Sequence, residues 1–186
     1  MKELLSEWIE TIQDHEIAIA RLIRRSPESL AAFVGSLARD DGPIGEHVRT
    51  FIVGDDLVET VASLKERIAS LRHSEHRYYR HRDGAQIGER LGYILDAIET
   101  LVLPAHPQQA FELLVLLVER DGDAMEQCAD HYDTVQNGME RAAGLMARAG
   151  ESLPQRDVKV TLERLMAEDR YGARRPLAAV VEAFAP

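Results

Sequence analysis

Apolar side chains recur at three- and four-residue spacing along most of the chain. One example is the run formed by Ile87, Leu91, Ile94, Leu95 and Ile98, which falls on one side of a helical wheel. Strict alternation of apolar and polar residues, which indicates a half-buried strand, does not persist over four residues between turns. The pattern therefore predicts an all-α protein of eight to ten helices with short connections.

Polar residues mark where several of these helices begin. Ser26 precedes Pro27, a pair typical of an N-cap followed by the first helical residue. Asp56 and Glu59 have the spacing of a capping box and predict the start of the longest helix, which we expect to reach Arg82. Asp-Gly pairs predict helix ends and occur at 41–42, 83–84 and 121–122.

Two segments of the chain repeat one order of features. Residues 26–48 and 106–128 both contain a proline start, an apolar helix, an Asp-Gly turn and an acidic second helix. Helix pairs of this kind stack into solenoids, so we expect antiparallel helix pairs in a repeat-like, solenoid-type compact bundle. We expect a single domain over 1–186, in which 54–186 form the core and 1–53 form N-terminal helices that are either a degenerate repeat or a cap.

The helix predicted from Pro107 to Arg120 lacks a polar side. It contains the segment AFELLVLLV, in which only one residue is charged. A helix that is apolar all round is typical of a buried position, so we expect this helix to be central and almost wholly buried.

Composition limits the classes of function. The 186 residues are 45% hydrophobic and 29% charged, and the net charge of -10 repels the phosphates of nucleic acids. The longest apolar run, Leu113–Val118, is far shorter than the ~20 residues of a membrane-spanning helix. The single cysteine, Cys128, excludes a disulfide within the chain and favours a reducing compartment. We therefore expect a cytoplasmic protein that binds neither nucleic acid nor membrane.

The most conspicuous candidate site is a basic stretch, residues 72–82, which holds four arginines and three histidines. If the helix that begins near Asp56 continues through it, His73, Arg77 and Arg80 point away from the apolar stripe, with His81 at the edge. The simplest interpretation is a solvated basic face, and this is the first surface that we expect to bind a partner.

Three other interpretations of this stretch remain open. His73 and His76 could share a metal ion, although His81 diverges from His76 by roughly 140° on the wheel. Arginines beside Tyr78-Tyr79 suit single-stranded nucleic acid, but the tyrosines are better explained as core residues of the helix. The patch could also pair with acidic surface, such as that within residues 1–10, in the same chain or in a second copy.

A second cluster contains Cys128, His131, Asp130 and Asp133. Cysteine, histidine and aspartate together can hold zinc, and a Cys-His pair can be nucleophilic. A lone cysteine in a helical stretch is more often a small core residue, so we assign no catalytic residue, metal ligand or cofactor. We retain Asp130 and Asp133 as a second candidate binding surface.

Three segments carry a resemblance to a known family: RYYRHRDGAQIGERLGYILDAIETLV, PQQAFELLVLLVERDGDAMEQCADHYDTV and LERLMAEDRYGARRPLAAVVEAF. In this order they resemble an uncharacterised bacterial all-helical family, over roughly residues 70–186. Asp130 and Asp133 fall at its acidic break, and Asp169, Tyr171 and Gly172 at its final turn. Similar helical regions accompany SWIM-type zinc fingers, but one cysteine cannot supply such a finger here. The resemblance implies a helical repeat-like fold and no activity.

These observations favour a non-catalytic module that binds a protein partner or a second copy of itself, because stacked helix pairs offer extended surface and no catalytic motif is present. One alternative is a metal-assisted or acid-base enzyme that uses the cluster around Cys128. The other is a nucleic-acid accessory protein that uses the basic stretch.

Overall fold

The computed structural model describes residues 24–39, 42–52, 56–71, 83–121 and 134–184. They form eight α-helices and one π-helical turn: α2 (Pro27–Leu37), α3 (Pro43–Ile52), α4 (Leu57–Ser70), α5 (Asp83–Ala97), η1 (Ile98–Val102), α6 (Pro107–Val118), α8 (Thr134–Gly150), α9 (Gln155–Ala167) and α10 (Leu177–Ala183). No strand occurs in these ranges, so the prediction of an all-α protein is confirmed. None of the described helices is long and apolar enough to cross a membrane.

The predicted helix starts are confirmed at two caps. The Ser26 hydroxyl accepts a hydrogen bond from the Ser29 amide at 3.3 Å, and Pro27 is the first residue of α2. One carboxylate oxygen of Asp56 accepts from the amides of Val58 and Glu59, at 2.9 and 3.1 Å. Both side chains satisfy amides that have no partner within the helix, which fixes where α2 and α4 begin.

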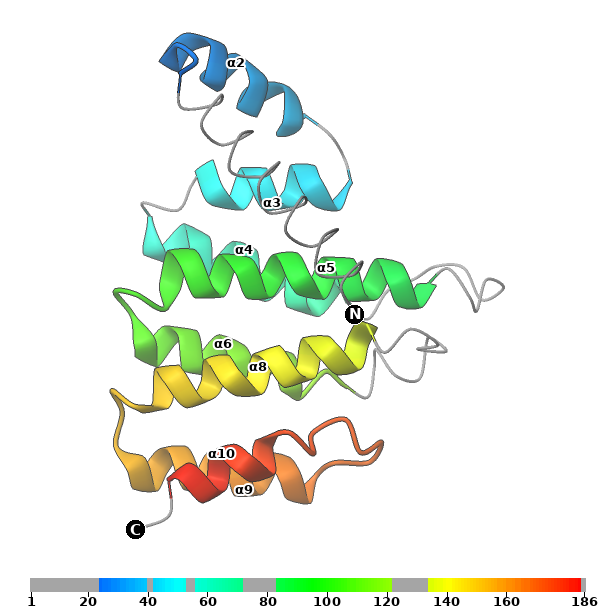
Figure 1. Ribbon diagram of the computed structural model, residues 1–186, viewed down its shortest axis with the longest axis vertical. Helices are drawn as coiled ribbons and strands as arrows, with labels where there is room; N and C mark the ends of the chain where they lie inside the picture. The colour runs from blue at the N-terminus through cyan, green and yellow to red at the C-terminus, as the bar shows by residue number, and fades with distance from the viewer. Residues whose placement is uncertain (1–23, 40–41, 53–55, 72–82, 122–133, 185–186) are drawn as a thin grey trace, which may run out of the picture.

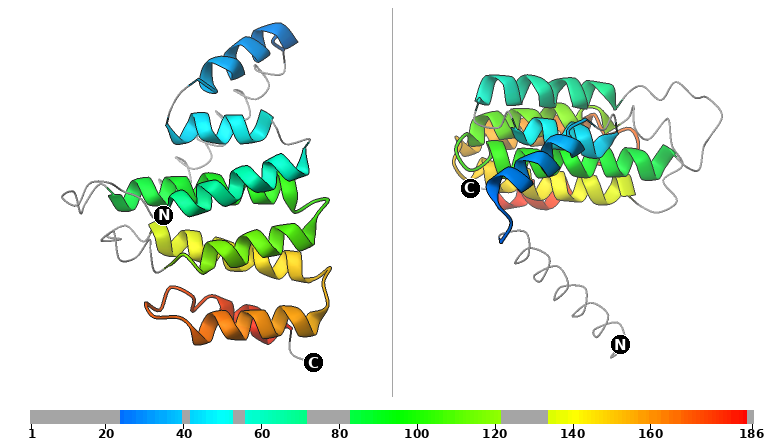
Figure 2. Two further views of the ribbon diagram at one scale, coloured as in Figure 1. Left: turned by 180° about the vertical axis from the view of Figure 1, so that it is seen from behind. Right: turned by 90° about the horizontal axis from the view of Figure 1, so that it is seen from above.

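The helices lie roughly parallel to one another and stack in layers (Figure 1). From one end of the molecule to the other, the layers are α2, α3, α4 with α5, α6 with α8, and α9 with α10. On one face α3 packs against α5, α5 against α8, and α8 against α10; on the other, α4 packs against α6. Figure 2 shows the same layers from behind, with α4, α6 and α9 nearer the viewer. Each layer below α3 is therefore a helix pair.

The core runs through the lower layers. Its largest fully buried side chains are Leu64, Ile68, Leu91, Ile94, Leu95, Ile98, Leu113, Leu114, Leu117, Met146, Leu162 and Leu165. The apolar stripe that the sequence predicts from Ile87 onward is thus confirmed as an inward face.

The predicted length of the helix that begins near Asp56, α4, is wrong. α4 ends at Ser70 rather than at Arg82. The Leu71 amide turns back to the Ile68 carbonyl at 3.3 Å, and the Ser70 hydroxyl donates to the Arg67 carbonyl at 2.7 Å. Both bonds tighten the last turn and satisfy carbonyls at the helix end. The basic stretch 72–82 lies outside the described residues.

Two expectations about burial also need correction. α6 lies in a middle layer, but only six of its twelve residues are buried, and Val115 and Leu116 are only partly covered. α2, whose apolar residues would be expected to face a core, contains no buried residue, and its Phe33 side chain is 54% exposed. An apolar helical face thus predicts a contact surface, although it does not identify the element that covers it.

Candidate functional site

All the site residues predicted from the sequence lie outside the described ranges. They are His73, Arg77, Arg80 and His81 of the basic stretch, and Asp130, Asp133, Cys128 and His131 of the second cluster. The structure therefore neither brings them together nor separates them. Among the residues that it does describe, no group of three or more His, Cys, Asp or Glu side chains could hold a metal ion.

The motif residues near the C-terminal end have a structural role. One carboxylate oxygen of Asp169 accepts from the amides of Tyr171 and Gly172, at 3.3 and 2.8 Å, and the other accepts from the Arg174 amide at 3.3 Å. Gly172 has a φ of 76°, in the left-handed region that favours glycine. This Asp-x-Tyr-Gly segment shapes the connection between α9 and α10.

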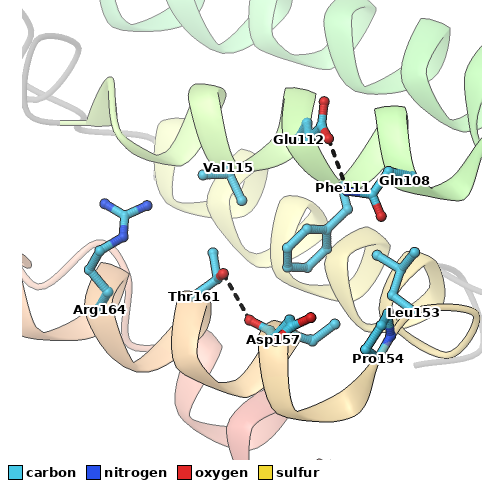
Figure 3. A pocket seen from close by; sticks show the side chains of 10 residues that line it. Gln108, Phe111, Glu112, Val115, Leu153, Pro154, Asp157, Thr161 and Arg164 are labelled. Carbon is cyan, nitrogen blue, oxygen red and sulfur yellow. Dashed lines mark hydrogen bonds between the residues drawn. The ribbon is translucent and has the colours of Figure 1, made fainter.

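A groove lies between α6 and α9 (Figure 3). It has a volume of about 400 Å³. Its apolar lining consists of Phe111 and Val115 from α6, Leu153 and Pro154 before α9, and Val158 from α9. The Phe111 ring lies between the two helices and points toward α9 (Figure 3). We call this hollow the α6–α9 groove.

The sequence explains why α6 faces the groove with apolar side chains. Leu113, Leu114 and Leu117 are buried in the core, and Phe111 is buried as well but lines the groove together with the partly buried Val115. These two residues are four apart and therefore neighbours on one helical face. Together they form the α6 wall of the groove.

The rim of the groove is polar. The Gln108 amide donates to the Glu112 carboxylate at 2.9 Å along α6. On α9, the Thr161 hydroxyl donates to the backbone carbonyl of Asp157 at 2.9 Å. Both carboxylate-bearing residues of the rim, Glu112 and Asp157, are exposed.

Arg164 closes the other end of the rim, away from Pro154 (Figure 3). Its guanidinium donates to Glu119 at 2.7 Å and to Glu168 at 3.3 Å. The hydrogen bond to Glu119 is the main reason why the pKa of Arg164 is raised above its ordinary value. Because Arg164 is paired with two carboxylates, the groove edge is acidic rather than basic.

This arrangement favours binding over catalysis. The only hydroxyl that lines the groove belongs to Thr161 and donates to a backbone carbonyl, so no neighbouring base activates it as a nucleophile. An apolar floor beneath an acidic rim suits an apolar side chain with basic neighbours. Sequence reasoning missed this site because it assigned every apolar residue of α6 to the core. The apolar residues on every side of α6 were the sequence signal that could have indicated a groove.

The match to known families covers almost the whole chain. Residues 15–185 match the model of a family of unknown function, DUF6880. The chain belongs to this family. The DUF6880 match begins at residue 15, whereas the resemblance found in the sequence began near residue 70. The match therefore includes N-terminal residues that the resemblance left out. It shows no link to SWIM-type zinc fingers. No curated protein and no solved structure matches the chain.

Proposed function

We propose that this DUF6880 protein is a non-catalytic protein-interaction module whose α6–α9 groove holds a segment with an apolar anchor and basic neighbours. The observation that carries the proposal is the apolar lining of the groove, in which the buried ring of Phe111 and the partly exposed Val115 lie beside the carboxylates of Glu112 and Asp157. Burying one leucine-sized side chain there contributes roughly 1.5–3 kcal/mol to binding.

Electrostatics supports a basic partner segment. The chain has a net charge of -10, and the two rim carboxylates add local negative charge at the groove. Complementary charge speeds association and disfavours acidic competitors, while the apolar anchor supplies most of the affinity. A nucleic acid, with its dense negative charge, does not fit such a rim.

The layered helix pairs support the wider proposal of a helical-repeat binding protein. Stacked pairs create grooves between successive layers, and α6 and α9 belong to two such layers. The partner is a protein or a second copy of this chain. The basic stretch, with His73, Arg77, Arg80 and His81, and the pair Asp130 and Asp133 remain further proposed surfaces. A cytoplasmic setting is part of the proposal, since the chain contains one cysteine.

A random peptide library displayed on phage tests the groove directly. Selection against the wild-type protein should enrich peptides in which Leu, Ile or Phe is flanked by Lys or Arg. Thr161→Arg places a cation in the groove and should weaken these peptides at least tenfold, which is about 1.4 kcal/mol.

Val160→Arg is the matched control. Val160 directly precedes Thr161 in α9, is 58% exposed and does not line the groove. The same arginine at this position should leave peptide binding unchanged. Failure to enrich any peptide, or an equal loss of affinity in both variants, would contradict the proposed function.

A further inference from the structure

Two arginines are buried in the described part of the chain, and only one of them has a carboxylate partner. Arg174 is 7% exposed and donates to both carboxylate oxygens of Asp121 and to the Leu165 carbonyl. Arg67 in α4 is 9% exposed, yet the one acceptor of its side chain is the Thr50 hydroxyl, at 3.0 Å. Within the described ranges Arg67 forms no ion pair.

One donor of the Arg67 guanidinium is unsatisfied. A guanidinium carries five N–H donors, and Nε of Arg67 is buried without an acceptor. Burial is the main reason why the pKa of Arg67 is lowered from its ordinary value. A buried charge without a partner is destabilising. Within the described residues this Nε–H has no acceptor, and the charge of Glu46 only opposes the lowering of the pKa of Arg67.

Arg67 borders a hollow between α3 and α4. The hollow has a volume of about 270 Å³ and is lined by Glu46, Arg49, Ser63, Glu66, Arg67 and Ser70. Beside the hollow, the buried Thr50 hydroxyl donates to the Glu46 carbonyl at 2.9 Å and lies 3.3 Å from the hydroxyl of Ser63, which lines it. The hollow is large enough for a small organic acid and is distinct from the α6–α9 groove.

We propose that the hollow between α3 and α4 is a binding site for a small monocarboxylate, whose oxygens pair with the guanidinium of Arg67. A carboxylate matches the planar fork of a guanidinium and accepts two parallel hydrogen bonds from it. Asp121 makes this pairing with Arg174 in the same protein. A carboxylate from solution would thus pair with Arg67 as the carboxylate of Asp121 pairs with Arg174.

The charges around the hollow favour a ligand with a single negative charge. Glu46 and Glu66 line the hollow together with Arg49 and Arg67, so the four formal charges cancel. One carboxylate adds a charge beside Arg67. A phosphate, with about -1.5 to -2 charges at pH 7, would also face the two glutamates.

Titration with sodium acetate at constant ionic strength, followed by NMR, tests the site. We expect a saturable shift of the Arg67 Nε–H signal and of the Ser63 and Ser70 amide signals. The affinity for acetate, measured at the two serine amides, should fall at least tenfold in Arg67→Met. Lys65→Met removes an exposed cation from the same helix and should leave acetate binding unchanged. Inorganic phosphate should bind more weakly than acetate.

Stability measurements supply a second test. Arg67→Met removes an unpaired buried charge, so the acetate-free variant should be at least as stable as the wild type. Two results would overturn the proposal: no saturable shift with acetate, or a loss of stability in Arg67→Met as large as that in Arg174→Met. Tighter binding of phosphate than of acetate would overturn the assignment of a monocarboxylate.

Discussion

Arg174 and Asp121 lie 53 positions apart in the chain and form a two-point ion pair inside the protein. Nε of Arg174 donates to Oδ2 of Asp121 at 2.8 Å, and Nη2 donates to Oδ1 at 2.7 Å. A third bond, from Nη1 to the Leu165 carbonyl at 2.9 Å, joins the end of α9 to the same guanidinium. The pair therefore connects the end of α6 with the segment between α9 and α10.

Breaking this pair should be strongly destabilising. Arg174→Met leaves the Asp121 carboxylate buried without its cation, so we expect a loss of about 3–5 kcal/mol in the free energy of unfolding. Urea unfolding of the variant measures this loss. The double variant Asp121→Asn/Arg174→Met should lose less than the sum of the two single losses, because it leaves no buried charge. Additive losses would show that the two side chains act independently.

Two of the glycines of α8, Gly138 and Gly144, should respond in opposite directions to alanine. A Cβ at Gly138 would lie 2.1 Å from Cδ2 of Leu91, a buried residue of α5, whereas nothing lies within 4 Å of a Cβ at Gly144. Gly138→Ala should lower the free energy of unfolding by about 1–3 kcal/mol through overpacking. Gly144→Ala should raise it by about 0.5–1 kcal/mol through helix propensity. Thermal unfolding of both variants distinguishes the effects, and equal shifts would refute the close contact of α5 with α8.

Local chemistry determined which features the sequence could predict. The Ser26 and Asp56 caps and the stripe from Ile87 depend on residues a few positions apart, and all three predictions are confirmed. The α6–α9 groove depends on how layers distant in sequence are spaced. The Arg174–Asp121 pair spans 53 positions, and no local pattern indicates it. The burial of Arg67 without an ion pair in the described residues was equally hidden, since a charged residue within a helix normally indicates a solvated position.

Metal analysis of the purified, untagged protein separates the proposed function from its enzyme alternative. We expect no stoichiometric metal, because a lone cysteine such as Cys128 within a helical stretch is typical of a small core residue. Elemental analysis by mass spectrometry, run beside light scattering for the molecular mass, gives the metal content per chain. Bound zinc, iron or manganese would instead favour a metal site that includes Cys128 and His131. A Cys128→Ser variant would then be the control.

Glu99 should make stability depend on pH in the acid range. Its carboxylate accepts hydrogen bonds from Arg141 and Arg148, which lower its pKa below the ordinary value of 4.5. The folded protein therefore binds this proton less readily than the unfolded chain, and the stabilisation is present above about pH 4.5 and lost as pH falls through the lowered pKa. Glu99→Gln should be less stable than the wild type at neutral pH, and the difference should shrink on acidification. Urea unfolding across this range measures it, and a constant difference would contradict the assignment.

His47 should also make the stability of the protein depend on pH, at values nearer neutral. Its ring stacks on Tyr93 with centroids 5.1 Å apart, and its Nδ1 is buried without a hydrogen-bond partner. Burial is the main cause that lowers the pKa of His47 below 6.5; the positive charge of Arg67 lowers it further, while Asp96 and a backbone hydrogen bond at Tyr93 oppose the shift. Below about pH 6.5 the unfolded chain binds the proton more readily, so stability should fall as pH falls from about 7 to 5.

His47→Phe isolates this effect, because phenylalanine keeps an aromatic ring against Tyr93 and does not titrate. The wild type should lose stability relative to this variant as the pH falls. In the wild type, the NMR titration of the His47 ring should have a midpoint below 6.5. A midpoint at or above 6.5 would mean that a carboxylate, rather than the buried guanidinium of Arg67, dominates the surroundings of His47.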